Sequence, residues 1–242
     1  MGGLPYQPAT EIPYAWKFGN GQPRLYTLDT DGRTQKIATP GKHDLSFAYF
    51  NTDTISSVTD NVYANLSTSF AYDPVDRLTT ANRSTDPQTF QLDKVGNRLS
   101  QVRNSASYTF TLDSVSNRLK SVSGGGHWRN LNYDGTGNVT SETRDDGTRA
   151  YGYDNFNRLQ TVSVNGTQVG DYRTDALGRR VLKIANGVYT YYVYAPTGEL
   201  LAEIGSTTTN YVWLNGQLLG ISRNGQFYAS HNGLCCIYQW SL

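Results

Sequence analysis

Few residues in this sequence have the type and spacing that catalysis or metal binding needs. The segment DTDG (29–32) resembles the opening of a calcium loop, but Pro40 stands at position twelve, where a bidentate Glu is needed. Asp145 and Asp146 precede Gly147, which favours a solvated turn over a carboxylate pair. No nucleophile elbow, phosphate loop or paired Cys/His cluster is present. We therefore expect no catalytic, cofactor or metal site, and no enzyme.

The histidines, cysteines and glycosylation motifs are equally uninformative. His43, His127 and His231 lack ligand spacing, so we expect surface or turn roles. Cys235 and Cys236 are adjacent, and neighbouring cysteines rarely meet disulfide geometry, so the stability of the fold must come from packing. The asparagines in glycosylation motifs carry little weight, because two of them also suit turns: Asn65, Asn82, Asn138 and Asn165.

Composition points to a thin β-structure. Eighteen Tyr and 24 Gly favour strands and turns, while apolar residues make up only 37% of the chain. Twenty-one basic residues nearly cancel 20 acidic ones, and no basic stripe suggests a nucleic-acid partner. No stretch has the roughly 18 apolar residues of a membrane span. The first residues do not resemble a secretion signal.

The elements that would position these residues form a repeat of about twenty residues. Before each anchor, apolar and polar residues alternate, which is typical of a strand with one buried face. Ten anchors follow one another at intervals of 19 to 23 residues: Leu28, Tyr49, Tyr72, Leu92, Leu112, Tyr133, Tyr153, Thr174, Tyr194 and Trp213.

A turn follows each anchor. An Asp can accept a hydrogen bond from the backbone N–H two residues on, and it occurs at Asp73, Asp93, Asp113, Asp134, Asp154 and Asp175. Gly or Asn then supplies the positive φ of a tight reversal, at Gly96-Asn97, Ser116-Asn117, Gly137-Asn138, Asn157 and Gly178.

The next strand opens with Arg-Leu, and an apolar residue follows three positions after the Leu. An offset of three does not keep one face of a flat strand, so we expect a β-bulge or face switch before Val102, Val122 and Val162. Each unit is thus strand, turn, return strand and turn. A lone hairpin buries too little to be stable, so neighbouring units must pair laterally.

The recurrent arginines allow two interpretations. Pairing with the Asp column along one rim is favoured, and it would concern Arg77, Arg98, Arg118 and Arg158. Alternatively, a ladder of Arg and Tyr holds sugars or acidic chains. Its candidate glycan contacts are Arg118, Tyr153 and Trp213.

Motifs such as YDNFNRL (153–159) at this spacing resemble the YD repeats of Rhs proteins and, more distantly, teneurins and toxin-complex shell subunits. The resemblance implies a long β-sheet that spirals round a hollow interior. In Rhs effectors that shell encloses a toxin carried carboxy-terminal to the repeats. It also implies a secreted or cell-surface location and suggests carbohydrate binding.

We predict three segments: an irregular start (1–15), the repeat array (16–232) and a non-repeat tail (233–242). In Rhs cores a segment like YASHN (228–232) runs on into D-H-L-G, which is missing here, so the tail indicates a truncation or frame change. An exposed sheet edge after Asn232 would promote self-association.

The sequence therefore predicts an all-β, non-catalytic shell section of hairpin repeats, with an enclosed toxin, absent from this chain, as partner. A carbohydrate-binding cell-surface module is the alternative function. A β-propeller with two units per blade is the alternative fold.

Overall fold

The computed structural model describes residues 14–18 and 21–230, and these residues are almost entirely β-strand. They fall into two units, 14–109 and 110–230, which are considered separately below. Most of the predicted segment 1–15 and all of the predicted tail 233–242 lie outside the described residues. The same is true of His231, Asn232, Cys235 and Cys236.

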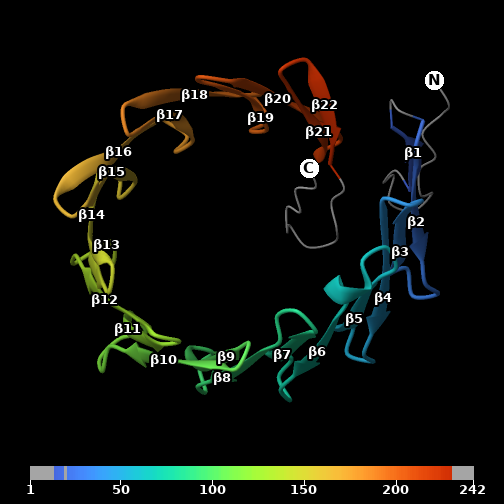
Figure 1. Ribbon diagram of the computed structural model, residues 1–242, viewed down its shortest axis with the longest axis horizontal. Coiled ribbons are helices and arrows are strands. Elements are labelled where there is room, and N and C mark those ends of the chain that lie inside the picture. Colours follow the sequence, from blue (N-terminus) through green and yellow to red (C-terminus); the bar gives the residue numbers. More distant parts are fainter. Residues whose placement is uncertain (1–13, 19–20, 231–242) are drawn as a thin grey trace. The chain divides into compact units, whose positions relative to one another are not determined.

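The described residues contain one short 3₁₀ helix, η1 (Ala64–Leu66), and 22 strands that pair antiparallel in chain order (Figure 1). In the first unit the strands are β1 (Ala15–Lys17), β2 (Pro23–Leu28), β3 (Thr34–Thr39), β4 (His43–Tyr49), β5 (Ile55–Asp60), β6 (Thr68–Tyr72), β7 (Leu78–Arg83), β8 (Gln88–Leu92) and β9 (Arg98–Arg103). Strand β10 (Ala106–Leu112) contains the boundary between the units.

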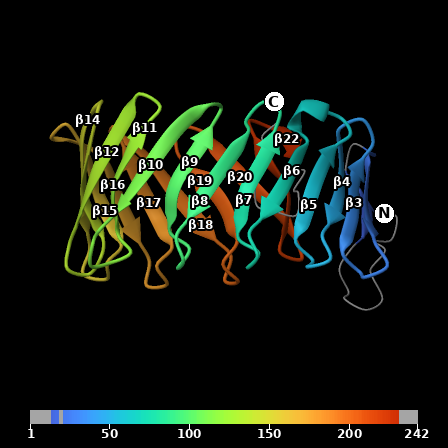
Figure 2. The ribbon, with the colours of Figure 1, turned by 90° about the horizontal axis from the view of Figure 1, so that it is seen from below.

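The second unit continues the same alternation of strand and turn. Its strands are β11 (Leu119–Gly124), β12 (His127–Tyr133), β13 (Val139–Arg144), β14 (Gly147–Tyr153), β15 (Leu159–Val164), β16 (Thr167–Thr174), β17 (Arg180–Ala185), β18 (Val188–Tyr194), β19 (Leu200–Ile204), β20 (Thr208–Leu214), β21 (Gln217–Arg223) and β22 (Gln226–Ala229). Figure 2 shows that, within each unit, the hairpin turns gather at the two ends of the strands.

The anchors mark the ends of alternate strands, as the periodicity predicts. Nine of the ten anchors are the last residue of an even-numbered strand, from Leu28 of β2 to Tyr194 of β18. Trp213 stands one residue before the end of β20. The all-β hairpin array is therefore confirmed, and the β-propeller alternative is not needed.

The predicted β-bulge is confirmed before Val162 and before Val102, and the one before Val122 stays a prediction. Tyr153 lies opposite Leu159, whereas its neighbour Gly152 lies opposite Thr161, so one residue of β15 has no partner. This extra residue brings Leu159 and Val162 to the same face of the sheet. The same shift occurs between the anchor and the residue before it at Leu28, Tyr49, Tyr72, Leu92, Tyr133, Thr174 and Tyr194.

In the turns that follow the anchors, the residue with positive φ is the third one after the Asp. Gly96, Gly137, Gly178 and Asn157 adopt it there, with φ between 58° and 99°. The prediction was wrong for Ser116 and Asn117, neither of which has a positive φ. That turn is one residue longer: the Asp113 N–H donates to the carbonyl of the fifth residue on, instead of the fourth.

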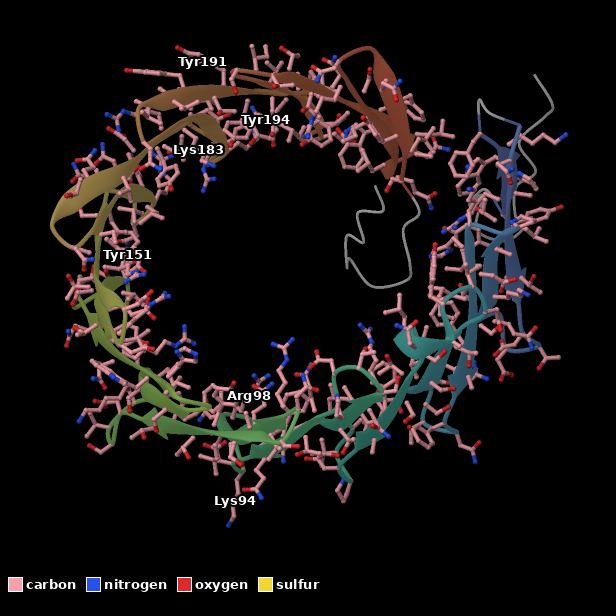
Figure 3. All side chains as sticks on the ribbon, in the orientation of Figure 1. Lys94, Arg98, Tyr151, Lys183, Tyr191 and Tyr194 are labelled. Carbon is pink, nitrogen blue, oxygen red and sulfur yellow. The ribbon has the colours of Figure 1, made fainter. Side chains whose placement is uncertain are left out.

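The sheet has two unlike faces. Figure 3 shows Tyr151, Lys183 and Tyr194 on the concave face of the second unit and Tyr191 on its convex face. The convex side chain of Tyr191 is 51% exposed, whereas Tyr151 and Tyr194 are half-buried. This single layer has little fully buried core, consistent with the low apolar content. The buried apolar residues among those described are Phe18, Ile37, Phe47, Ala202, Leu218 and Ile221.

Candidate functional site

Where the anchor is a tyrosine, its hydroxyl joins the repeat to the one before it. The hydroxyl of Tyr153 donates to the carbonyl of Val139, 2.8 Å away, and Val139 stands opposite the preceding anchor, Tyr133. The bulge leaves an unpaired residue beside this carbonyl. The same bond is donated by Tyr49 to Thr34, Tyr72 to Ile55, Tyr133 to Leu119, Tyr194 to Arg180 and, through its indole N–H, Trp213 to Leu200.

A second link runs through arginine. Arg158 donates from Nε to Asp154 Oδ2 at 2.7 Å and from Nη1 to the carbonyl of Asp175, in the next repeat, at 2.8 Å. Arg77 makes the same two bonds, to Asp73 at 2.6 Å and to the Asp93 carbonyl at 2.8 Å. The predicted Asp–Arg pairing is confirmed for these two residues, and each arginine also joins two repeats.

The sequence analysis missed two arginines at the same position, Arg33 and Arg179. They pair with Asp29 and Asp175 at 2.8 Å. Their guanidinium groups lie 4.7 Å and 5.1 Å from the ring centres of the next anchors, Tyr49 and Tyr194. Such cation–π contacts contribute about 0.5–1 kcal/mol at exposed sites. Their place four residues after the Asp is visible in the sequence.

The turn carboxylates accept several hydrogen bonds each. Asp134 Oδ1 accepts from the N–H groups of Thr136 and Asn138, and Oδ2 accepts from the Asn138 side chain. Bonds from the Asn138 and Thr136 side chains lower the pKa of Asp134 from 3.8 to about 2. In Asp73 the pKa is also lowered, first by the backbone N–H of Arg77. The predicted acceptance two residues on is therefore confirmed.

The placement of Arg98 in the arginine column was wrong. The motif LDKVGNRL (92–99) is one residue longer than YDNFNRL (153–159). Gly96 keeps the turn as short as in the other repeats. Asn97, instead of an arginine, therefore stands four residues after Asp93 and bonds to its carboxylate. The strand then shifts by one residue: Arg98 lies opposite Leu92, its guanidinium 4.7 Å from the ring centre of Phe90. The same shift leaves Val102 on the exposed face, at 39% exposure.

The motif LDSVSNRL (112–119) is also one residue longer than YDNFNRL, but here the turn itself is longer. Arg118 therefore keeps the position that Arg77 and Arg158 have at the start of the return strand. Its Nη1 lies 3.4 Å from the Asp134 carbonyl, and its guanidinium lies 5.6 Å from the ring centre of Tyr133. These contacts are longer than the corresponding ones of Arg158 and Arg179. Arg118 is also exposed.

A recurring Tyr–Asp–Arg unit that joins consecutive hairpins is thus the dominant geometry of both units. The family model described as teneurin YD-shell matches residues 25–228. The chain belongs to the teneurin YD-shell family. The family supports a structural, shell-like role for this YD-shell chain.

Solved structures agree on the fold. The YD-shell chain resembles the Tc holotoxin pore of Photorhabdus luminescens with a TM-score of 0.62 at 15% identity, over 90% of this chain and 14% of that one. It resembles the crystal structure of TcdB2-TccC3-TEV with a TM-score of 0.62 at 14% identity, over 93% and 16%. The chain therefore spans a small part of these structures. No curated protein matches it in sequence.

One open pocket of about 530 Å³ interrupts this regular YD-shell pattern in the second unit. It forms at the long turn and is lined by Asp113, Arg118, Lys120, Asn132 and Tyr133, among others. Arg118 is thus the one predicted glycan contact that lines this pocket. Tyr153 and Trp213 instead use their polar groups to join repeats.

The remaining chemical candidates of the YD-shell chain have structural partners. Asp29 accepts from the backbone N–H groups of Asp31 and Arg33, which supports the turn reading over a calcium loop. His127 lies 2.6 Å from Asp145, and Asp146 pairs with Arg149 at 2.8 Å. No group of three potential metal ligands occurs within residues 14–18 and 21–230. Nor does that part of the chain hold a helix with the length and apolar character of a membrane crossing.

Proposed function

We propose that this chain is a section of a protein shell that surrounds a polypeptide cargo. The observation that carries the proposal is the repeated link through Tyr and Arg, in which the recurring residues of the motif join one hairpin to the next. A sheet built in this way can be extended repeat by repeat without a second layer.

The concave face is the side that would meet the cargo. In the second unit it carries half-buried Tyr151 and Tyr194 and the cation Lys183, whereas the turns stand at the strand ends (Figures 2 and 3). By analogy with Rhs proteins, the cargo is an effector carried carboxy-terminal to the repeats. A secreted or cell-surface location follows from the same analogy.

Protease protection tests enclosure. A disordered, protease-sensitive reporter fused after residue 242 is expected to be cleaved more slowly than the same reporter fused to an unrelated β-protein. Negative-stain images of the fusion should show a thin wall round a hollow. Equal cleavage rates together with compact, filled particles would rule out the shell.

The pocket at Arg118 favours a second candidate function, carbohydrate binding. An aromatic ring (Tyr133) beside a cation (Arg118), a carboxylate (Asp113) and an amide (Asn132) offers both stacking and hydrogen bonds to a sugar. Within this pocket the long turn exposes the arginine that the regular repeats hold between neighbours.

A glycan array distinguishes this candidate from a purely structural role. We expect the wild-type chain to bind a subset of glycans, Arg118→Ala to lose that binding, and Arg173→Ala to retain it. Arg173 is a suitable control because it is exposed and lies outside the pocket. Absence of any glycan signal for the wild type counts against carbohydrate binding.

A further inference from the structure

Three arginines gather on the concave face of the second unit, outside the Tyr–Asp–Arg links. Arg129 of β12 lies opposite Arg144 of β13, and Arg149 of β14 lies opposite Glu142 of β13. Arg129 and Arg149 each stand four residues before an anchor tyrosine, and alternation therefore places them on the same face as Tyr151 (Figure 3). We call Arg129, Arg144 and Arg149 the arginine cluster.

Glu142 is the buried counter-charge of the arginine cluster, and its carboxylate is fully engaged. It is 4% exposed and accepts from Arg144 Nη2 at 2.5 Å, from the Tyr151 hydroxyl at 3.1 Å and from Arg129 Nη1 at 3.4 Å. Arg149 instead donates from Nη2 to Asp146, whose side chain is 59% exposed at the turn. The three guanidinium groups are therefore paired with two carboxylates, the buried Glu142 and the exposed Asp146.

Two donors of the cluster have no acceptor. Arg144 Nε and Arg149 Nη1 are buried and have no hydrogen-bond partner among the described residues. A buried donor without a partner is destabilising, and more so when the group is charged. These two groups come from adjacent strands, and Arg144 faces Gly147, which adds no side chain. Both are N–H donors of cationic groups, so each is suited to an acceptor with negative charge.

We propose that the arginine cluster binds a carboxylate of an acidic polypeptide segment held against the concave face. Guanidinium groups donate two parallel hydrogen bonds to a carboxylate, and such charge-assisted bonds are the strong ones. The polypeptide as ligand rests on the proposed function, in which the concave face meets a cargo. The carboxylate chemistry rests on the two donors alone.

Titration with an acetylated, amidated hexaglutamate peptide at low salt tests the proposal in the full chain. We expect saturable binding that weakens about tenfold in Arg149→Gln, a substitution that leaves the contacts of Glu142 in place. The matched control is Arg173→Gln, which removes the same charge from an arginine that already pairs with Asp171, and it should bind like the wild type.

Three outcomes overturn the proposal. Equal weakening by Arg149→Gln and Arg173→Gln would reduce the effect to general surface charge. Inorganic phosphate that binds as tightly as the peptide would make this a site for free anions. Circular dichroism confirms that each variant is folded. If Arg149→Gln fails to fold, Arg149→Lys replaces it, and peptide binding at wild-type strength by that variant overturns the proposal.

The peptide titration is independent of enclosure. A chain that binds hexaglutamate but leaves the fused reporter unprotected would retain the carboxylate site and lose the shell. A chain that protects the reporter but does not bind the peptide would retain the shell and lose the site.

Discussion

At the residue scale, an anchor tyrosine has three roles, of which a leucine at the same position can fill only one. Its ring fills the concave face, its hydroxyl reaches the carbonyl of the preceding repeat, and in several repeats its ring lies under an arginine of that repeat. Anchors such as Leu92 and Leu112 provide only the apolar part. This difference explains why the repeat tolerates Leu but returns repeatedly to Tyr.

Removal of one hydroxyl should measure this link. We expect Tyr153→Phe to lower the free energy of unfolding by about 1 kcal/mol, because the ring stays while the bond to the Val139 carbonyl is lost. Tyr191→Phe, on the exposed convex face, should change it by less than about 0.5 kcal/mol. Urea denaturation of both variants checks this; equal effects would show that the hydroxyl bond is not specific.

Acid should weaken the turns. The pKa of Asp134 is lowered in the folded state, so its contribution to stability is complete above its ordinary pKa of 3.8. That contribution is lost as the pH falls through about 2. The turn aspartates Asp73, Asp93 and Asp154 also have lowered pKa values, so the whole array should lose stability in the same window.

Thermal melting between pH 6 and pH 2 measures the effect. We expect the melting temperature to fall most steeply below pH 4, and Asp134→Asn to show a smaller fall than the wild type. An identical pH profile for the two proteins would mean that this carboxylate does not contribute to the acid sensitivity.

At the element scale, an extra residue in the motif has two different outcomes. In the turn at Asp93, Gly96 adopts a φ of 95° and keeps the turn short, so the extra residue displaces the strand and moves Arg98 out of its column. In the turn at Asp113, Ser116 does not adopt a positive φ, and the turn lengthens instead. The pocket at Arg118 forms at this longer turn.

A glycine pair tests the requirement for positive φ. Gly96→Ala should destabilise the protein by about 1 kcal/mol, because an added Cβ is strained at this φ even though no atom lies within 4 Å of it. Gly135→Ala, equally open but without a positive φ, should be neutral or slightly stabilising. Denaturation midpoints check the pair, and equal losses would contradict the turn assignment.

The sequence predicted the elements well because their signals are local. Alternation before Tyr153, the Asp that follows it and the three-residue offset to Val162 each depend on a few neighbouring residues. The side-chain links between repeats were not predicted, because the acceptor of the Tyr153 hydroxyl lies 14 residues earlier. The arginine cluster was missed for the same reason: Arg129, Arg144 and Arg149 meet only through the register of three strands.

At the scale of the whole molecule, the account depends on stability that is shared between repeats. Each hairpin is a single layer with little fully buried surface, and side-chain hydrogen bonds tie it to the repeats before and after it. Such an array behaves as a sum of weak units and nearest-neighbour contacts, so the contacts between repeats must supply the stability. The predicted self-association through a sheet edge stays a prediction, since Asn232 lies outside the described residues.

The most direct test compares one hairpin with the whole chain. Circular dichroism and amide exchange of a peptide of residues 147–164, which contains β14 and β15 without their neighbours, are compared with the same residues in the full protein. We predict that the peptide is unfolded and its amides unprotected, whereas in the full chain these amides are protected. A peptide that folds by itself, with protection equal to that in the full chain, would contradict the account.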